Sequence, residues 1–131
     1  MLPKIAVIDD DYISQFTAKR FIEKYEVAKE VVAFPNGQEA FDYFSEQTVE
    51  SAPKAILLDL NMPVLDGWGF LDEFMKLPET FTREISVYIM TSSISERDIN
   101  QSKTYPVVKG YFVKPLSKEN LEKVKLASID C

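Results

Sequence analysis

The sequence predicts an α/β fold in which a five-stranded parallel sheet is covered by helices on both faces. Short apolar runs alternate with amphipathic stretches five times along the 131 residues. The runs are apolar at nearly every position, as in strands that are buried on both faces. The connections between them are long enough to be crossover helices. Because 46% of the residues are hydrophobic, we expect one compact domain over residues 1–131 that holds the whole function, without an output domain.

The five apolar runs are short and are bounded by charged or turn residues, as buried strands are. Strands are therefore predicted at residues 4–8, 30–34, 54–58, 85–90 and 110–113. The stretches 45–54 and 78–84 have no such run and are predicted to be surface loops.

Helical spacing follows each strand. In the first case Ala18, Phe21, Ile22 and Tyr25 recur at i, i+3, i+4 and i+7, and one of the three preceding aspartates is the expected N-cap. The remaining helices are predicted around residues 40–44, around 70–75 with an end before Pro78, at 95–103 and at 117–128 with Ser117 as N-cap. The helix at 95–103 has only a thin apolar face.

Charge and hydropathy exclude several partners. A formal charge of -6 and a pI near 4.7 argue against nucleic acid or an anionic membrane, since both need a basic surface. No apolar stretch approaches the roughly 20 residues that span a bilayer, and the N-terminus is too acidic for a secretory signal. We therefore expect a cytoplasmic protein.

The content of cysteine and histidine narrows the chemistry. The only cysteine, Cys131, cannot form an internal disulfide, which agrees with a reducing compartment. The chain has no histidine, so it can build neither a Ser-His-Asp or Cys-His nucleophile nor an imidazole metal site.

Polar residues follow four of the five predicted strands. These are Asp9–Asp11, Asp59, Thr91–Ser93 and Lys114–Pro115. Each alone has an ordinary interpretation as a helix cap, a turn or a solvated loop. In a parallel sheet, however, all four lie at the same edge, where such folds bind their ligands. Their convergence predicts a functional site.

The predicted site is too acidic to be stable without a cation. Two carboxylates about 4 Å apart repel by roughly 4 kcal/mol at an effective dielectric constant of about 20, and Lys114 alone cannot compensate for three of them. An all-oxygen site suits a hard ion, so Mg2+ is the expected cofactor, with Mn2+ as an alternative. Lys114 and the Thr91 hydroxyl would then bind phosphoryl oxygens.

Asp59 is the expected nucleophile. The chain has four glycines and no Gly-rich phosphate loop, so a bound nucleotide is not expected. An aspartate that attacks an activated phosphoryl donor is the simplest remaining chemistry, and carboxylates are known phosphoryl acceptors. Asp59 is alone at its strand end, whereas the other candidates form a crowded triplet.

Four motifs in this order and spacing resemble the response-regulator receiver domain of two-component signalling. They read AVIDDD, ILLDLNMPVLDG, IMTSS and YFVKPL, and the resemblance runs from about Lys4 to Val124. It implies a flavodoxin-like fold with strand order 2-1-3-4-5. It also implies that the chain is not a conventional enzyme but catalyses its own phosphorylation and slow dephosphorylation at Asp59.

The resemblance assigns roles to the acidic loop residues. Asp59 would be the phosphoacceptor, Asp10 a direct Mg2+ ligand and Asp9 an assisting metal residue. Asn61 would offer its backbone carbonyl to the metal. Asp11 would be either the start of the first helix or a spare carboxylate.

The resemblance also assigns the residues that contact the phosphoryl group and the switch. Thr91 would contact it through its hydroxyl and Lys114 through its ammonium, with a cis Lys114–Pro115 bond turning the lysine into the site. Tyr111 falls at the aromatic switch position, so phosphorylation would reshape the face made by the last two helices and the last strand. An ordinary half-buried strand aromatic is the alternative for Tyr111.

One segment departs from the commonest family pattern. Many receivers have a Gly-Ala pair before the last strand, where this chain reads YPVVKG at residues 105–110. Pro106 is expected to end the preceding helix early. Trp68 is near the start of the third helix and away from Asp59, so we expect it to have a packing role.

Three functions fit these residues. The first is a stand-alone receiver that takes a phosphoryl group from a histidine kinase or histidine phosphotransferase, then passes it on or docks on a downstream target that the sequence does not identify. The second is a phosphatase of the haloacid dehalogenase type, although that motif needs a second aspartate where this chain has Asn61. The third is a degenerate receiver without chemistry, which the joint presence of Asp10, Asp59, Thr91 and Lys114 disfavours.

Overall fold

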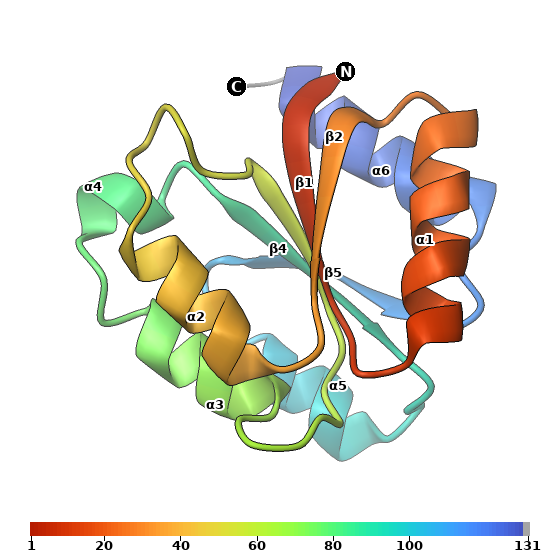
Figure 1. Ribbon diagram of the computed structural model, residues 1–131. Helices are drawn as coiled ribbons and strands as arrows, with labels where there is room; N and C mark the ends of the chain where they lie inside the picture. The colour runs from red at the N-terminus through yellow and green to blue at the C-terminus, as the bar shows by residue number, and fades with distance from the viewer. Residues whose placement is uncertain (130–131) are drawn as a thin grey trace.

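The computed structural model describes residues 1–129, so Cys131 lies outside the described part of the chain. Five parallel strands form one sheet in the order β2-β1-β3-β4-β5 (Figure 1). The predicted fold class and strand order are confirmed.

The strands are β1 (Leu2–Ile8), β2 (Ala28–Phe34), β3 (Ala55–Leu58), β4 (Ser86–Thr91) and β5 (Val108–Val113). The helices are α1 (Tyr12–Lys24), α2 (Gly37–Ser45), α3 (Gly67–Phe74), α4 (Glu79–Thr82), α5 (Glu96–Ser102) and α6 (Lys118–Ile129).

Two apolar clusters cover the two faces of the sheet. One lies between the sheet and helices α1 and α6, and the other between the sheet and helices α2 and α3 (Figure 1). Successive residues of a strand serve opposite faces: in β3, Ala55 and Leu57 belong to the first cluster, and Ile56 and Leu58 to the second. The central strand is therefore apolar throughout because both of its faces are buried.

The two edge strands are longer than predicted. β2 begins at Ala28, before the predicted start at Glu30, and so includes the exposed Lys29, while β5 begins at Val108 and includes the exposed Lys109. Charged residues are common on edge strands, where one side meets solvent. An uninterrupted apolar run therefore underestimates the length of these strands, and it does so for the inner strand β1 as well, which begins at Leu2 and not at Lys4.

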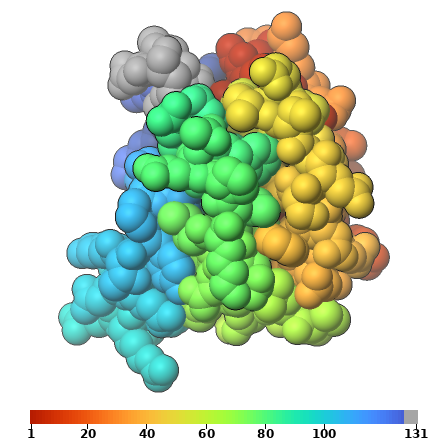
Figure 2. Space-filling view, turned by 90° about the vertical axis from the view of Figure 1, so that its left-hand side faces the viewer, coloured from red at the N-terminus to blue at the C-terminus, as the bar shows by residue number. Residues whose placement is uncertain are grey.

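Helix α4 corrects the prediction of a surface loop at residues 78–84. Phe81 and Thr82 are buried, and the N–H of Thr82 donates to the carbonyl of Pro78. Pro78 is the N-cap of this turn, with a φ of -53° and an extended ψ of 136°. One turn is too short to show helical periodicity. In Figure 2 the α3–α4 segment (green) lies between the loop after α2 (yellow) and the α5–β5 segment (cyan and blue).

The capping residues explain where the other helices begin. The Asp11 carboxylate accepts a hydrogen bond from the N–H of Ile13, which makes Asp11 the N-cap of α1. Ser117 caps α6, because its hydroxyl accepts the N–H of Asn120. Helix α5 begins after Ser95 and ends at Ser102, before Pro106 is reached. No helix within residues 1–129 has both the length and the apolar character needed to cross a membrane.

Trp68 has the predicted packing role. Its ring stacks on Tyr105, with 5.8 Å between the ring centroids. The Tyr105 hydroxyl donates to Asp72 Oδ1 at 2.7 Å. Burial and this hydrogen bond raise the pKa of Tyr105 to about 12. We call these three residues the aromatic clasp; it attaches the segment between α5 and β5 to α3.

Candidate functional site

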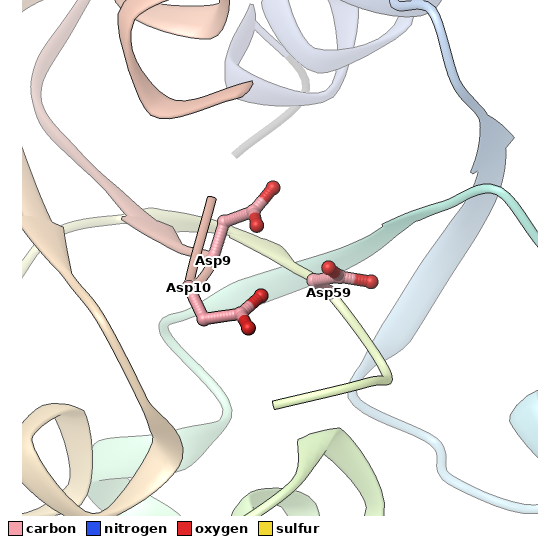
Figure 3. A group of neighbouring side chains, drawn as sticks. All are labelled: Asp9, Asp10 and Asp59. Carbon is pink, nitrogen blue, oxygen red and sulfur yellow. The ribbon is translucent and has the colours of Figure 1, made fainter. Parts of the chain in front are cut away.

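Three carboxylates converge at the carboxyl ends of β1 and β3. Asp9 and Asp10 follow β1, and Asp59 follows β3. The two strands are paired in parallel register with Ile8 opposite Leu58, so Asp9 and Asp59 continue side by side. Each of the three carboxylates offers an oxygen that lies within 4.8 Å of the others (Figure 3). The predicted convergence of these carboxylates is present.

Lys114 reaches the same place from the end of β5. Its Nζ donates to Asp9 Oδ2 at 2.7 Å and to Asp59 Oδ2 at 3.4 Å. A third bond of 3.2 Å runs to the hydroxyl of Ser14 in α1. The Lys114–Pro115 bond is cis, as the family resemblance implied.

Burial makes the charges of this cluster mutually dependent. Burial raises the pKa of the Asp9 carboxyl above its usual range, and hydrogen bonds from Lys114 and the N–H of Asp11 only partly oppose the rise. Burial alone would lower the pKa of Lys114, but its hydrogen bonds and attraction to Asp9 and Asp59 outweigh burial and raise that pKa. Lys114 is therefore a cation at neutral pH.

The two oxygens of Asp59 have different environments. Oδ1 accepts the N–H of Leu60 at 2.7 Å, and the N–H of Asn61 lies 3.5 Å from it. Oδ2 faces Lys114. The residue is buried, whereas Asp10 is exposed. Backbone donors thus fix the orientation of the Asp59 carboxylate at the rim of the sheet.

The loop after β3 folds back on that strand. Gly67 donates its N–H to the carbonyl of Leu60, and a Cβ at Gly67 would lie 2.5 Å from the backbone oxygen of Asp59. Only glycine permits this approach. Within the loop Val64 has a φ of 68°, and the N–H of Leu65 donates to the carbonyl of Pro63. The loop keeps the backbone of Asn61 next to Asp59.

Thr91 and Tyr111 both form hydrogen bonds with Ser93, in the loop after β4. Thr91 is the buried last residue of β4, and its hydroxyl oxygen accepts the N–H of Ser93 at 3.3 Å. The hydroxyl of Tyr111, a half-buried residue of β5, donates to the carbonyl of the same Ser93 at 2.9 Å. The loop after β4 is therefore the physical link between the two residues.

Sequence reasoning missed two residues of α1 that contact the site. Ser14 contacts Lys114, and the Gln15 carboxamide donates to the backbone carbonyls of Asp9 at 2.6 Å and Phe34 at 3.3 Å. The available signal was the N-cap: once Asp11 is the cap, the first turn of α1 must lie beside the ends of β1 and β2.

The arrangement favours cation binding and phosphoryl chemistry. Three carboxylates lie close together and Lys114 pairs with two of them, Asp9 and Asp59, so the cluster carries excess negative charge, and the carboxylates offer only oxygen ligands. The family model for the response regulator receiver domain matches residues 5–125. The chain belongs to this family.

Solved receiver-type structures resemble the whole chain. A two-component response regulator from Cytophaga hutchinsonii is 25% identical with a TM-score of 0.90, covering 99% of this chain and 98% of its own. The phosphorylated cyanobacterial phytochrome response regulator RcpA is 29% identical with a TM-score of 0.77, covering 98% and 92%. The Mn2+-bound form of the response regulator Rcp1 is 25% identical with a TM-score of 0.75, covering 96% and 91%. The chain is thus a receiver domain of the kind used in two-component signalling.

Proposed function

We propose that this receiver domain accepts a phosphoryl group on Asp59 from a phosphohistidine of a histidine kinase or histidine phosphotransferase. A carboxylate oxygen of Asp59 attacks phosphorus, the P–N bond breaks, and the leaving imidazole takes up a proton, which leaves an acyl phosphate on Asp59. The observation that carries this proposal is the geometry of Asp59, whose carboxylate is oriented by backbone N–H groups and lies beside a lysine and two more carboxylates.

The donor set fits a hard divalent cation. Asp10, Asp59 and the backbone carbonyl of Asn61 would hold Mg2+ or Mn2+, with Asp9 assisting, because an oxygen-only cluster with excess negative charge suits these ions. The Mn2+-bound form of the similar Rcp1 supports this proposal. The bound ion would neutralise charge that develops on the phosphoryl oxygens.

Lys114 and Thr91 would stabilise the remaining phosphoryl oxygens. Lys114 is a cation next to Asp59 and can exchange the longest of its three hydrogen bonds, 3.4 Å to Asp59 Oδ2, for one to a phosphoryl oxygen. Thr91 lies at the end of β4, the strand that pairs with β3. If the Thr91 hydroxyl turns to the phosphoryl group, its hydrogen bond with the N–H of Ser93 breaks. Movement of Ser93 would then alter the hydrogen bond between its carbonyl and the Tyr111 hydroxyl.

The signal would leave through the face formed by α5, β5 and α6. Tyr111 lies on β5, and its hydroxyl contacts the loop that leads into α5. A downstream protein would recognise the phosphorylated arrangement of this face, or the phosphoryl group would pass on to another phosphotransferase. No specific observation favours a dehalogenase-type phosphatase, since the position of its second aspartate is Asn61.

Mass spectrometry tests the proposal directly. Incubation with acetyl phosphate and Mg2+ should add one phosphoryl mass, and Asp59→Asn should abolish the adduct. Asp66→Asn is the matched control, because Asp66 is in the same loop and Asn is an equally good N-cap for α3. An undiminished adduct in Asp59→Asn would place the acceptor elsewhere. Repeating the assay with phosphorylated candidate kinases would identify the natural donor.

A further inference from the structure

We propose that Ser14 is a positioning residue that holds the Lys114 ammonium between Asp9 and Asp59 and thereby sets the rate of phosphoryl transfer. This inference rests on the proposed function of Asp59. An ammonium has three donor hydrogens, and three acceptors surround Lys114 Nζ: Asp9 Oδ2 at 2.7 Å, Ser14 Oγ at 3.2 Å and Asp59 Oδ2 at 3.4 Å. Ser14 is the only neutral member of this set.

The capping of α1 explains why the Ser14 hydroxyl is oriented toward the lysine. Asp11 is the N-cap, so Ser14 is the third residue of the helix, where a side chain turns back toward the cap. The Ser14 hydroxyl donates to Asp11 Oδ2 at 3.5 Å, which leaves the lone pairs of Oγ free to accept from Lys114. A chain of hydrogen bonds thus runs from Asp11 through Ser14 to Lys114.

Packing alone does not fix Lys114 in this place. A cavity of about 280 Å³ adjoins the side chain and is lined by Ser14, Thr17, Met90 and Leu116, among others. Since open space lies beside the lysine, its hydrogen bonds must determine where the ammonium stays. The same space can accept one extra methyl group at position 14.

The unequal contacts show what Ser14 adds. Lys114 lies closer to the fully buried Asp9 than to Asp59, so without a third partner the ammonium would be drawn toward Asp9. During transfer, Lys114 must exchange its Asp59 contact for a phosphoryl oxygen. The contact to Ser14 can persist through this exchange, because Ser14 belongs to the rigid first turn of α1 and carries no charge.

Three variants test the proposal by their rates of phosphorylation with acetyl phosphate and Mg2+. Ser14→Ala should slow the reaction by about tenfold, the effect of losing one hydrogen bond to a charged group. Ser14→Thr keeps the hydroxyl and should restore a rate close to that of the unmodified protein. Thr17→Ala lies one turn further along α1, lines the same cavity and should leave the rate unchanged.

A second measurement needs no phosphoryl donor. NMR exchange of the Lys114 ammonium hydrogens with water should be faster in Ser14→Ala than in Ser14→Thr or Thr17→Ala, because one of the three hydrogen bonds is lost. An unchanged phosphorylation rate together with unchanged hydrogen exchange in Ser14→Ala would overturn the proposal. Equal slowing of phosphorylation in Thr17→Ala would also overturn it, because it would indicate a packing effect. If the unmodified chain takes up no phosphoryl group, the proposed function fails, while the exchange measurement still decides the role of Ser14.

Discussion

The two faces of the sheet and the end where its strands finish, here called the carboxyl-terminal edge, bury different kinds of side chain. The faces bury apolar side chains such as Phe44, Phe70 and Phe74, whose rings contact one another. The carboxyl-terminal edge instead buries polar and charged side chains, whose burial opposes folding. Among the side chains that the structure describes, five polar or charged ones are buried, and three of these, Asp9, Asp59 and Thr91, lie at this edge.

This contrast separates stability from chemistry. Burying apolar area drives folding, whereas burying like charges opposes it. The edge is therefore held in place by the faces, since Asp9 and Asp59 directly follow strands that the two clusters fix and Thr91 is the last residue of another such strand. Changes on the faces should alter the free energy of unfolding and leave the chemistry of the folded fraction intact. Changes at the edge should alter the chemistry, and they should change the free energy of unfolding less than the loss of a buried ring on a face does.

The largest effect is expected on a face. Phe70→Ala removes a fully buried ring and should lower the free energy of unfolding by about 3–5 kcal/mol. Phe16→Ala is the matched control, because Phe16 is 61% exposed, and should change it by no more than about 0.5 kcal/mol. Urea unfolding followed by circular dichroism measures both. Equal losses in the two variants would contradict the assignment of the core to this face.

The edge should respond most strongly to the cation. If Mg2+ binds the folded site as proposed, and not the unfolded chain, a hundredfold excess over its dissociation constant should stabilise the protein by about 2.7 kcal/mol. Asp10→Asn removes an exposed member of the cluster and should lose most of this gain. Thermal unfolding with Mg2+ or with NaCl of equal ionic strength measures the effect. Equal stabilisation by NaCl would show general screening and no metal site.

Backbone strain at the edge gives a smaller effect. Val64 is β-branched and has a φ of 68°, a conformation that glycine adopts without penalty. Val64→Gly should raise the free energy of unfolding by about 1 kcal/mol. Glu26→Gly offers the comparison away from the site, because Glu26 has a φ of 54° just after α1 and is not β-branched. Denaturant midpoints that fall in Val64→Gly would refute the assigned strain.

The smallest effect concerns the aromatic clasp and depends on pH. The pKa of Tyr105 is raised to about 12, which means that folding favours the protonated hydroxyl. The stability that this hydroxyl contributes is therefore complete below the ordinary tyrosine pKa and is lost as pH rises through about 12. Tyr105→Phe should cost about 0.5–1 kcal/mol near neutral pH through the lost bond to Asp72. The difference between the two proteins should shrink above pH 10. Urea titrations at several pH values measure it, and a pH-independent difference would contradict this origin.

The sequence predicted the features that repeat along the chain and missed those that depend on a single tertiary contact. Continuous apolar runs identified all five strands because the central ones are buried on both faces. The polar residues after them converged because parallel strands end at one edge. Helix α4 was missed because four residues show no periodicity. Ser14 was missed because its partner Lys114 is 100 residues away in the chain.

Some features came from the family resemblance and not from the residues themselves. The cis Lys114–Pro115 bond and the strand order 2-1-3-4-5 agree with that resemblance. The assignment of Asp11 was left open between helix start and spare carboxylate, and its hydrogen bond to the N–H of Ile13 decides for the helix start. The metal and phosphoryl roles of the site residues stay predictions for the experiments above.

The aromatic clasp gives this protein an intrinsic fluorescent probe. Trp68 is the only tryptophan in the sequence, and its ring stacks on Tyr105 just before β5. Its emission therefore reports on one junction, between α3 and the strand that carries Tyr111. Any rearrangement that separates these two segments changes the surroundings of a single fluorophore. A rearrangement of this junction can accordingly be followed in real time, in an unlabelled protein, while a candidate phosphoryl donor is added.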